Sequence, residues 1–184
     1  MLKRVIALIV MGILVVGSVS CGEKDSGTVA VMGEHAQKGE FDYAETVGNI
    51  VFCGNNIKMP CTFSGFGDGF TAKDGVVLES GIGTYFHLDY NDEEVGGIVL
   101  ADCKANDDVA DKNIVRIDIN ATEKCSINGI DCSDTFNKIE QTIGTPTYTD
   151  DFHAKYAESE NQYVEFKRAS KNSKDIVEVT IFNG

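Results

Sequence analysis

The sequence predicts an α+β protein made of two tandem units, each containing a hairpin, a short helix and an antiparallel sheet. A cysteine-flanked hairpin pattern occurs twice, at residues 52–61 and 124–132. An amphipathic helix pattern follows the second hairpin, and alternating apolar and polar segments follow both. These observations place the first unit at residues 41–122 and the second at residues 123–184.

Length and composition support a folded core and exclude several classes of protein. The chain has 184 residues, of which 42% are apolar, so it can bury a substantial core and is not a disordered chain. It carries 29 acidic residues against 16 basic ones, a formal charge of −13. A nucleic-acid partner needs clustered basic side chains, and so does docking to anionic lipid by charge. We therefore expect neither.

The first 20 residues have the pattern of a secretory signal peptide. Lys3 and Arg4 precede an apolar run, Val5 to Val16, which small residues and Cys21 follow. Cleavage before Cys21 would leave 14 basic residues against 29 acidic ones, a charge of −15. Residues 21–40 are polar and are predicted to form a flexible tether.

The end of this signal resembles the lipobox of bacterial lipoproteins. The residues that carry the resemblance are Ser18-Val19-Ser20-Cys21. In that family the cysteine is acylated, typically with palmitate, and becomes the mature N-terminus. The resemblance implies a lipid attached at Cys21 and a protein held on the outer face of the cell membrane. The alternative is an ordinary secretory signal with an incidental cysteine.

Both predicted hairpins are defined by turn residues. In the first, the strand-like run 49–53 meets the turn signal Gly54-Asn55-Asn56, and 57–59 resumes. In the second, Asn128-Gly129 is the strongest two-residue hairpin signal. A short helical turn or an ordered loop is expected after the first hairpin.

A helix is predicted directly after the second hairpin. Asp131 or Ser133 is the expected N-cap, and the apolar residues fall on one face. Those apolar residues are Phe136, Ile139 and Ile143. Gly144 ends the helix and Pro146 prevents its continuation.

Strands are predicted where apolar and polar residues alternate. In the first unit they are residues 76–78, 84–90, 98–101 and 114–119. In the second unit they are residues 162–167 and 175–182.

The second unit resembles a group of small envelope proteins. Asn128-Gly129-Ile130 through Thr135, then Ile143-Gly144-Thr145-Pro146, is similar to the helix motif of the outer-membrane assembly lipoproteins (SmpA/OmlA) and the β-lactamase-inhibitor-like group. The similarity covers residues 123–150. It implies helices packed on an antiparallel sheet, two such units in tandem, and binding of other proteins outside the cytoplasm. The layout of the whole chain is similar to uncharacterised lipoproteins of the Gram-positive cell surface.

Five cysteines follow Cys21, and disulfides are the expected state of an exported protein. If Asn128-Gly129 forms a two-residue turn, Cys125 and Cys132 lie across the hairpin and can bridge. The pairing of Cys53, Cys61 and Cys103 stays open. Zinc is a weaker alternative because short C-x-x-C pairs are missing, and buried thiols are another.

The sequence predicts no catalytic, cofactor-binding or metal residues. The histidines lack metal-type spacing, and the acidic runs do not fit a calcium loop. We expect a membrane-anchored extracytoplasmic lipoprotein that is not an enzyme and acts as a protein-binding or envelope structural module. Its expected partner is an unidentified envelope or extracellular protein. The alternative is a small-ligand-binding lipoprotein or a cell-envelope enzyme.

Overall fold

A computed structural model describes residues 40–132 and 134–184. The predicted signal peptide, Cys21 and all but the last residue of the predicted tether lie outside the described residues. The described part is mostly β-sheet with two short α-helices, so the α+β class holds in this coarse sense. No helix in this part is long and apolar enough to cross a membrane.

The larger sheet has eight antiparallel strands in the order β3-β4-β5-β6-β12-β11-β10-β9. Its strands in the first half of the chain are β3 (Phe70–Val77), β4 (Thr84–Tyr90), β5 (Glu93–Leu100) and β6 (Ile114–Ile119). Those in the second half are β9 (Tyr148–Thr149), β10 (His153–Ser159), β11 (Gln162–Arg168) and β12 (Ile176–Asn183).

The smaller sheet has four strands in the order β2-β1-β7-β8. They are β1 (Ile50–Phe52), β2 (Asn55–Ile57), β7 (Cys125–Ile127) and β8 (Ile130–Asp131). Each half of the sequence thus supplies one hairpin to the smaller sheet and four successive strands to the larger one. The two contributions meet where β1 pairs with β7 and where β6 pairs with β12.

The two hairpins have the same kind of turn. Asn128 and Gly129 both have positive φ, 48° and 77°, which confirms the predicted two-residue turn. In the first hairpin Phe52 pairs with Asn55, so the turn residues are Cys53 and Gly54, with φ of 50° and 79°. The predicted turn at residues 54–56 is therefore wrong: the turn has two residues and begins one residue earlier, and Asn55 and Asn56 belong to β2.

Helices are few and short. α2 (Phe136–Ile143) has the predicted end at Gly144, but its N-cap is Thr135, whose side chain accepts from the Lys138 N–H. α1 (Tyr43–Val47) precedes the first hairpin and was not predicted. The segments after the first hairpin and before the second contain only single 3-10 turns, η1 (Phe63–Phe66) and η2 (Thr122–Lys124).

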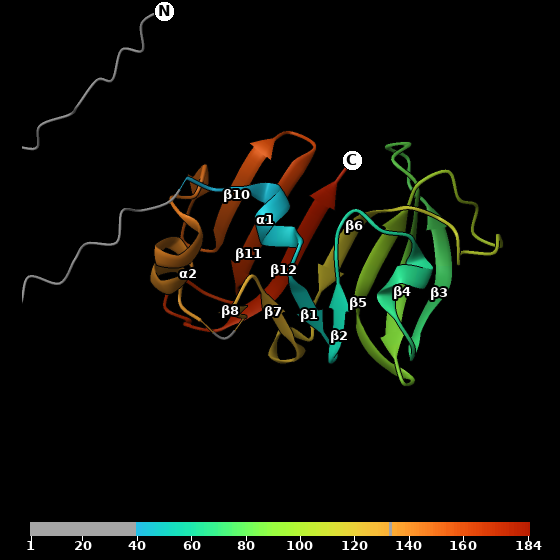
Figure 1. Cartoon of the computed structure of the whole chain (residues 1–184), viewed down its shortest axis with the longest axis horizontal. Coiled ribbons are helices and arrows are strands. Elements are labelled where there is room, and N and C mark those ends of the chain that lie inside the picture. Colours follow the sequence, from blue (N-terminus) through green and yellow to red (C-terminus); the bar gives the residue numbers. More distant parts are fainter. Residues whose placement is uncertain (1–39, 133) are drawn as a thin grey trace, which may run out of the picture. The chain divides into compact units, whose positions relative to one another are not determined.

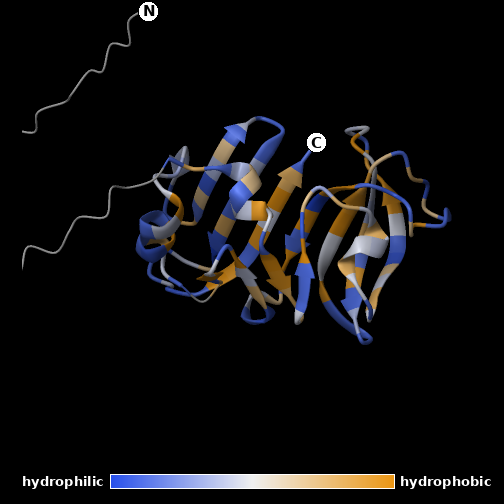
Figure 2. Ribbon diagram, in the orientation of Figure 1, coloured by the Kyte–Doolittle hydropathy of each residue, from blue (hydrophilic) through white to orange (hydrophobic). Residues whose placement is uncertain are grey.

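The core lies between one face of the larger sheet and the layer formed by the smaller sheet and the helices (Figure 1). Phe52 of β1 and Phe70 of β3 join the layers, with ring centroids 5.6 Å apart. On the larger sheet, alternate residues such as Leu88, Ile117 and Phe166 are fully buried. Figure 2 shows the corresponding alternation of hydrophobic and hydrophilic residues along these strands. The polar positions between them form the other face.

Candidate functional site

The face of the larger sheet that points away from the core is called here the open face. It is formed by the residues that alternate with the core residues, and most of them are partly exposed. They include Tyr85, His87, Gly97, Arg116, Asp118, Lys155, Tyr163, Glu165, Lys167, Glu178, Thr180 and Phe182.

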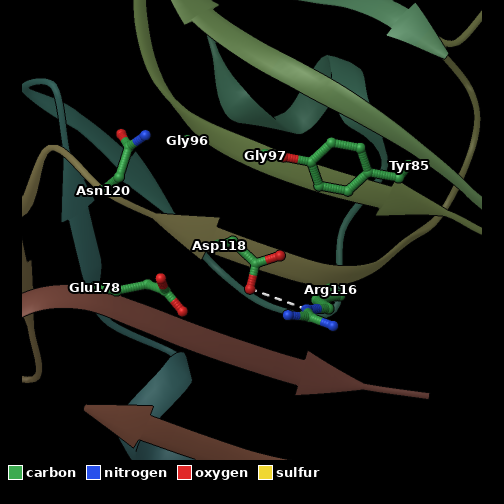
Figure 3. Close-up of a pocket in the computed structure, with 7 residues that line it drawn as sticks. All are labelled: Tyr85, Gly96, Gly97, Arg116, Asp118, Asn120 and Glu178. Atoms are coloured by element: carbon green, nitrogen blue, oxygen red, sulfur yellow. Dashed lines mark hydrogen bonds and ion pairs between the residues drawn. The ribbon is translucent and has the colours of Figure 1, made fainter. Parts of the chain in front are cut away.

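A hollow of about 230 Å³ lies in the middle of the open face (Figure 3). Strands β4, β5, β6 and β12 contribute to it, so it spans the junction between the two halves of the larger sheet. It is lined by Tyr85, Gly96, Gly97, Arg116, Asp118, Asn120 and Glu178.

Tyr85 and Gly97 define the wall of this hollow on the β5 side. A Cβ atom at Gly97 would lie 2.5 Å from two carbons of the Tyr85 ring, so the ring lies directly over the glycine. Figure 3 shows the tyrosine reaching across β5 with its hydroxyl at Gly97. Burial, and then the charge of Asp118, raises the pKa of the Tyr85 hydroxyl. The hydroxyl therefore stays protonated at neutral pH and can donate a hydrogen bond.

Arg116 and Asp118 form a fixed ion pair on β6. The Arg116 Nε lies 2.9 Å from Asp118 Oδ1, which also accepts from the Thr180 hydroxyl at 2.7 Å. Burial lowers the pKa of the Arg116 guanidinium. The charge of Asp118 and the hydrogen bond to it raise this pKa by more, so the net shift is upward. Both charged groups are thus held in place before any partner arrives.

A row of cross-strand neighbours continues from the hollow toward β11. Arg116 pairs with Phe182, and Phe182 pairs with Tyr163. The Tyr163 and Phe182 rings are stacked with centroids 5.2 Å apart, and Lys155 Nζ lies 3.7 Å from the centroid of Tyr163. Beside this row Lys167 and Glu178 form an ion pair of 3.3 Å. The open face therefore combines ordered aromatic rings with paired charges.

The structure brings Cys125 and Cys132 together but does not bond them. Both thiols are buried, and Cys132 N donates to Cys125 O at 3.3 Å. A hydrogen bond to the Cys132 thiol, and then burial, raises the pKa of Cys125. All five cysteines of the described residues are free, so the disulfide stays a prediction.

The histidines of the described residues each lie next to one carboxylate. His87 Nδ1 is 3.5 Å from Glu94, and His153 Nδ1 is 3.0 Å from Asp150. Within residues 40–132 and 134–184, no group of three or more His, Cys, Asp or Glu side chains has the arrangement of a metal site.

Comparisons of the chain with family models, with curated proteins and with solved structures give no significant match. The resemblances of the lipobox and of residues 123–150 therefore stay predictions.

Tyr85, Arg116 and Asp118 lie within the predicted strands 84–90 and 114–119, but no motif in the sequence groups them into a site. The signal that could have done so is Gly96-Gly97, two adjacent glycines inside a strand. Glycine in a strand interior often marks close approach of another group, which here is the Tyr85 ring.

Proposed function

We propose that this protein is a membrane-anchored extracytoplasmic lipoprotein that binds an envelope or extracellular protein through the open face, without catalysis. The observation that carries the proposal is the hollow in which Tyr85 lies over Gly97 beside the Arg116–Asp118 pair. Tyrosine and arginine are among the side chains that contribute most to protein–protein affinity when they are held near the centre of an interface.

Pre-organisation supports this role. The Tyr85 ring rests on a glycine, the Arg116 side chain is fixed by Asp118, and the Tyr163 and Phe182 rings support one another. Side chains that are already ordered lose less conformational entropy when a partner binds. The row from Tyr85 to Tyr163 crosses five strands, roughly 19 Å, which is suitable for part of a protein interface.

The proposal includes a tandem origin of the two halves, in the manner of the β-lactamase-inhibitor-like group. The support is topological: each half contributes a hairpin with a two-residue turn and four successive strands. The halves meet through equivalent strands, β1 with β7 and β6 with β12. The hollow would then lie across the junction of the two units, where both supply binding residues.

The predicted lipid anchor and the net negative charge both indicate what kind of partner the protein binds. Lipid on Cys21 would place the described domain outside the cell, at the end of the tether. After cleavage before Cys21 the chain would carry 14 basic and 29 acidic residues, and this charge of −15 favours a partner with a basic surface, because complementary charge speeds encounter and suppresses wrong pairings.

Site-specific photo-crosslinking on the protein's own cells tests the proposal. A photoreactive amino acid replaces His87 on the open face in one variant and Asn137 on α2 in another; both positions are exposed. We expect one recurrent protein adduct from position 87 that is lost with Tyr85→Ala, and no such adduct from position 137. Equal adducts from both positions, or none from position 87, would contradict the proposal, as would turnover of an envelope substrate by the purified protein.

A further inference from the structure

The hollow of the open face has an aromatic wall beside its polar groups. The Tyr85 ring leans across β5 over Gly97 and is partly exposed, so a molecule in the hollow can touch it. The face of an aromatic ring carries partial negative charge and favours contact with weakly positive C–H groups. This wall therefore suits a ligand that presents C–H groups on one side.

Two carboxylates of the hollow each have one oxygen in use and one to spare. Asp118 Oδ1 accepts from both Arg116 and Thr180, whereas Oδ2 accepts from no described residue. Glu178 Oε2 lies 3.3 Å from Lys167 Nζ, and Oε1 accepts no hydrogen bond within the described part of the chain. Figure 3 shows the Glu178 carboxylate pointing toward Asp118. Neighbouring strands thus offer two acceptors to the same hollow.

The same hollow also offers donors. Arg116 uses Nε for Asp118, and its two Nη groups donate to none of the residues that the structure describes. The Tyr85 hydroxyl keeps its proton at neutral pH, and the exposed Asn120 amide can both donate and accept. All these side chains are partly or fully exposed, so a ligand can reach them.

This combination favours a neutral molecule over an ion. The charges are already paired, Arg116 with Asp118 and Glu178 with Lys167. An anion would meet two carboxylates, and a cation would meet the guanidinium. Hydroxyl groups both donate and accept, so neighbouring hydroxyls of a sugar can use the spare oxygens and N–H groups together. The volume, about 230 Å³, is small and suits a single sugar ring.

We infer that the hollow of the open face binds one neutral pyranose unit carried by the protein partner. The inference rests on the proposed function, because it assigns a sugar to the centre of the same surface. The Tyr85 ring contacts the C–H groups of the sugar, and Asp118 and Glu178 accept from its hydroxyls. The stacked rings of Tyr163 and Phe182 lie outside the hollow and are left for the polypeptide, which favours a glycosylated protein over a free sugar.

Titration of the full chain carrying Cys21→Ser, followed by nuclear magnetic resonance, tests sugar binding alone. The neutral probes are the methyl glycosides of glucose, galactose, mannose and N-acetylglucosamine. The charged probes, at pH 6, are methyl glucosaminide and methyl glucuronide. We expect saturable shifts of the Gly97 amide, at the millimolar affinity of so small a ligand, with at least one neutral glycoside. Both charged glycosides should bind at least tenfold more weakly. No saturable shift with the four neutral probes, or equal binding of a charged one, would overturn the inference.

Variants of the hollow locate the site. Tyr85→Ala and Glu178→Ala should each weaken the neutral glycoside at least tenfold, whereas Glu178→Gln, which keeps an acceptor oxygen, should weaken it less. Tyr163→Ala and Glu165→Ala, on the open face but outside the hollow, are the matched controls and should change the affinity less than twofold. Thermal unfolding checks that each variant is folded. Unchanged affinity in Glu178→Ala, or an equal loss in the controls, would overturn the assignment.

Crosslinking from position 87 separates this inference from the proposed function. The purified photoreactive protein is added to cells that lack it, with and without mild periodate treatment, which cleaves the vicinal diols of sugars. Periodate should abolish the protein adduct, and an excess of the bound glycoside should reduce it. A protein adduct that survives both treatments would overturn the inference and leave the proposed function standing. Glycoside binding without any protein adduct would contradict the protein partner and not the sugar site.

Discussion

The ring of Tyr85 lies over Gly97 so closely that two ring carbons come within 2.5 Å of the place where a Cβ atom would be. The Tyr85 side chain on the neighbouring strand therefore requires a glycine at position 97. The backbone conformation does not require one, because the φ angle of Gly97 lies outside the left-handed region. Gly97→Ala should displace the ring and lower the free energy of unfolding by about 1 kcal/mol. Crosslinking from position 87 should fall as far as it does in Tyr85→Ala.

A double variant separates this clash from any general effect of alanine on β5. In Tyr85→Ala the ring is gone, so adding Gly97→Ala should cost much less than it does in the wild type. Chemical denaturation of the four proteins measures this coupling. Equal costs of Gly97→Ala in both backgrounds would show that the ring and the glycine are independent.

The turn glycines of the two hairpins should be equally sensitive to substitution. Gly54 and Gly129 have φ of 79° and 77°, and nothing lies within 4 Å of a Cβ atom at either position. Gly54→Ala and Gly129→Ala should therefore each lower the free energy of unfolding by about 1 kcal/mol, through backbone strain alone. Urea denaturation measures the free energy of unfolding of each variant. Asn128→Gly, at φ 48°, is the control and should be nearly neutral.

A Cys125–Cys132 disulfide should form under oxidising conditions. Ser126 and Asp131 are paired in the second hairpin, and Cys125 precedes Ser126 while Cys132 follows Asp131. Because the pKa of Cys125 is raised, little thiolate is present at neutral pH and oxidation should be slow. The bridge should add about 2 kcal/mol of stability, since the closed loop is short.

Non-reducing peptide mapping of the aerated protein identifies the linkage. Cys103→Ser should leave it intact, and Cys132→Ser should abolish it. A bridge from Cys125 to Cys53 instead would show that the hairpin pair is not the favoured one.

Asp150 should make the turn between β9 and β10 sensitive to acid. Its carboxylate accepts from the Phe152 N–H at 2.7 Å and the Tyr148 hydroxyl at 2.8 Å, and these bonds lower its pKa. Because the folded pKa lies below the ordinary value of about 3.9, the unfolded chain takes up the proton first. The stabilisation is therefore present above about pH 4 and is lost as the pH falls further.

Thermal unfolding of Asp150→Asn between pH 7 and pH 2 checks this dependence. The variant should melt below the wild type at pH 7, and the two midpoints should converge in acid. Asp151→Asn, which removes only the exposed ion pair with Lys171, is the control and should have a smaller effect. A constant difference between Asp150→Asn and the wild type at every pH would exclude this mechanism.

Lipidation at Cys21 should be detectable by metabolic labelling. A clickable fatty acid should mark the full-length protein and should fail to mark Cys21→Ser. The same substitution should release the protein from the membrane fraction. Equal labelling of both proteins would mean that the signal is an ordinary secretory one.

Several elements follow from short stretches of sequence, because their physical causes are local. Asn128-Gly129 adopts the positive φ angles of a two-residue turn, and Gly144 ends α2. The alternating residues of β6 and β11 are buried on one side of the sheet. Turn geometry, helix capping and a period of two each depend on a few neighbouring residues.

Other elements could not be predicted from the sequence because they are very short and depend on contacts with other segments. α1 has five residues, too few to show a helical period, and its Tyr43 hydroxyl donates to Phe182 O at 2.8 Å, a contact 139 residues away. β9 has only two residues and forms by pairing with β10.

The sequence by itself determined the strongly marked strands, the second hairpin and the helix that follows it. Only the tertiary structure decided that β6 pairs with β12 and β1 with β7. It also decided that Tyr85 rests on Gly97 and that the Tyr156 hydroxyl is buried without a partner among the described residues. Alternation fixes which face of a strand is buried but carries no information about which distant strand lies beside it, and the hollow lined by Arg116 and Glu178 depends on that pairing.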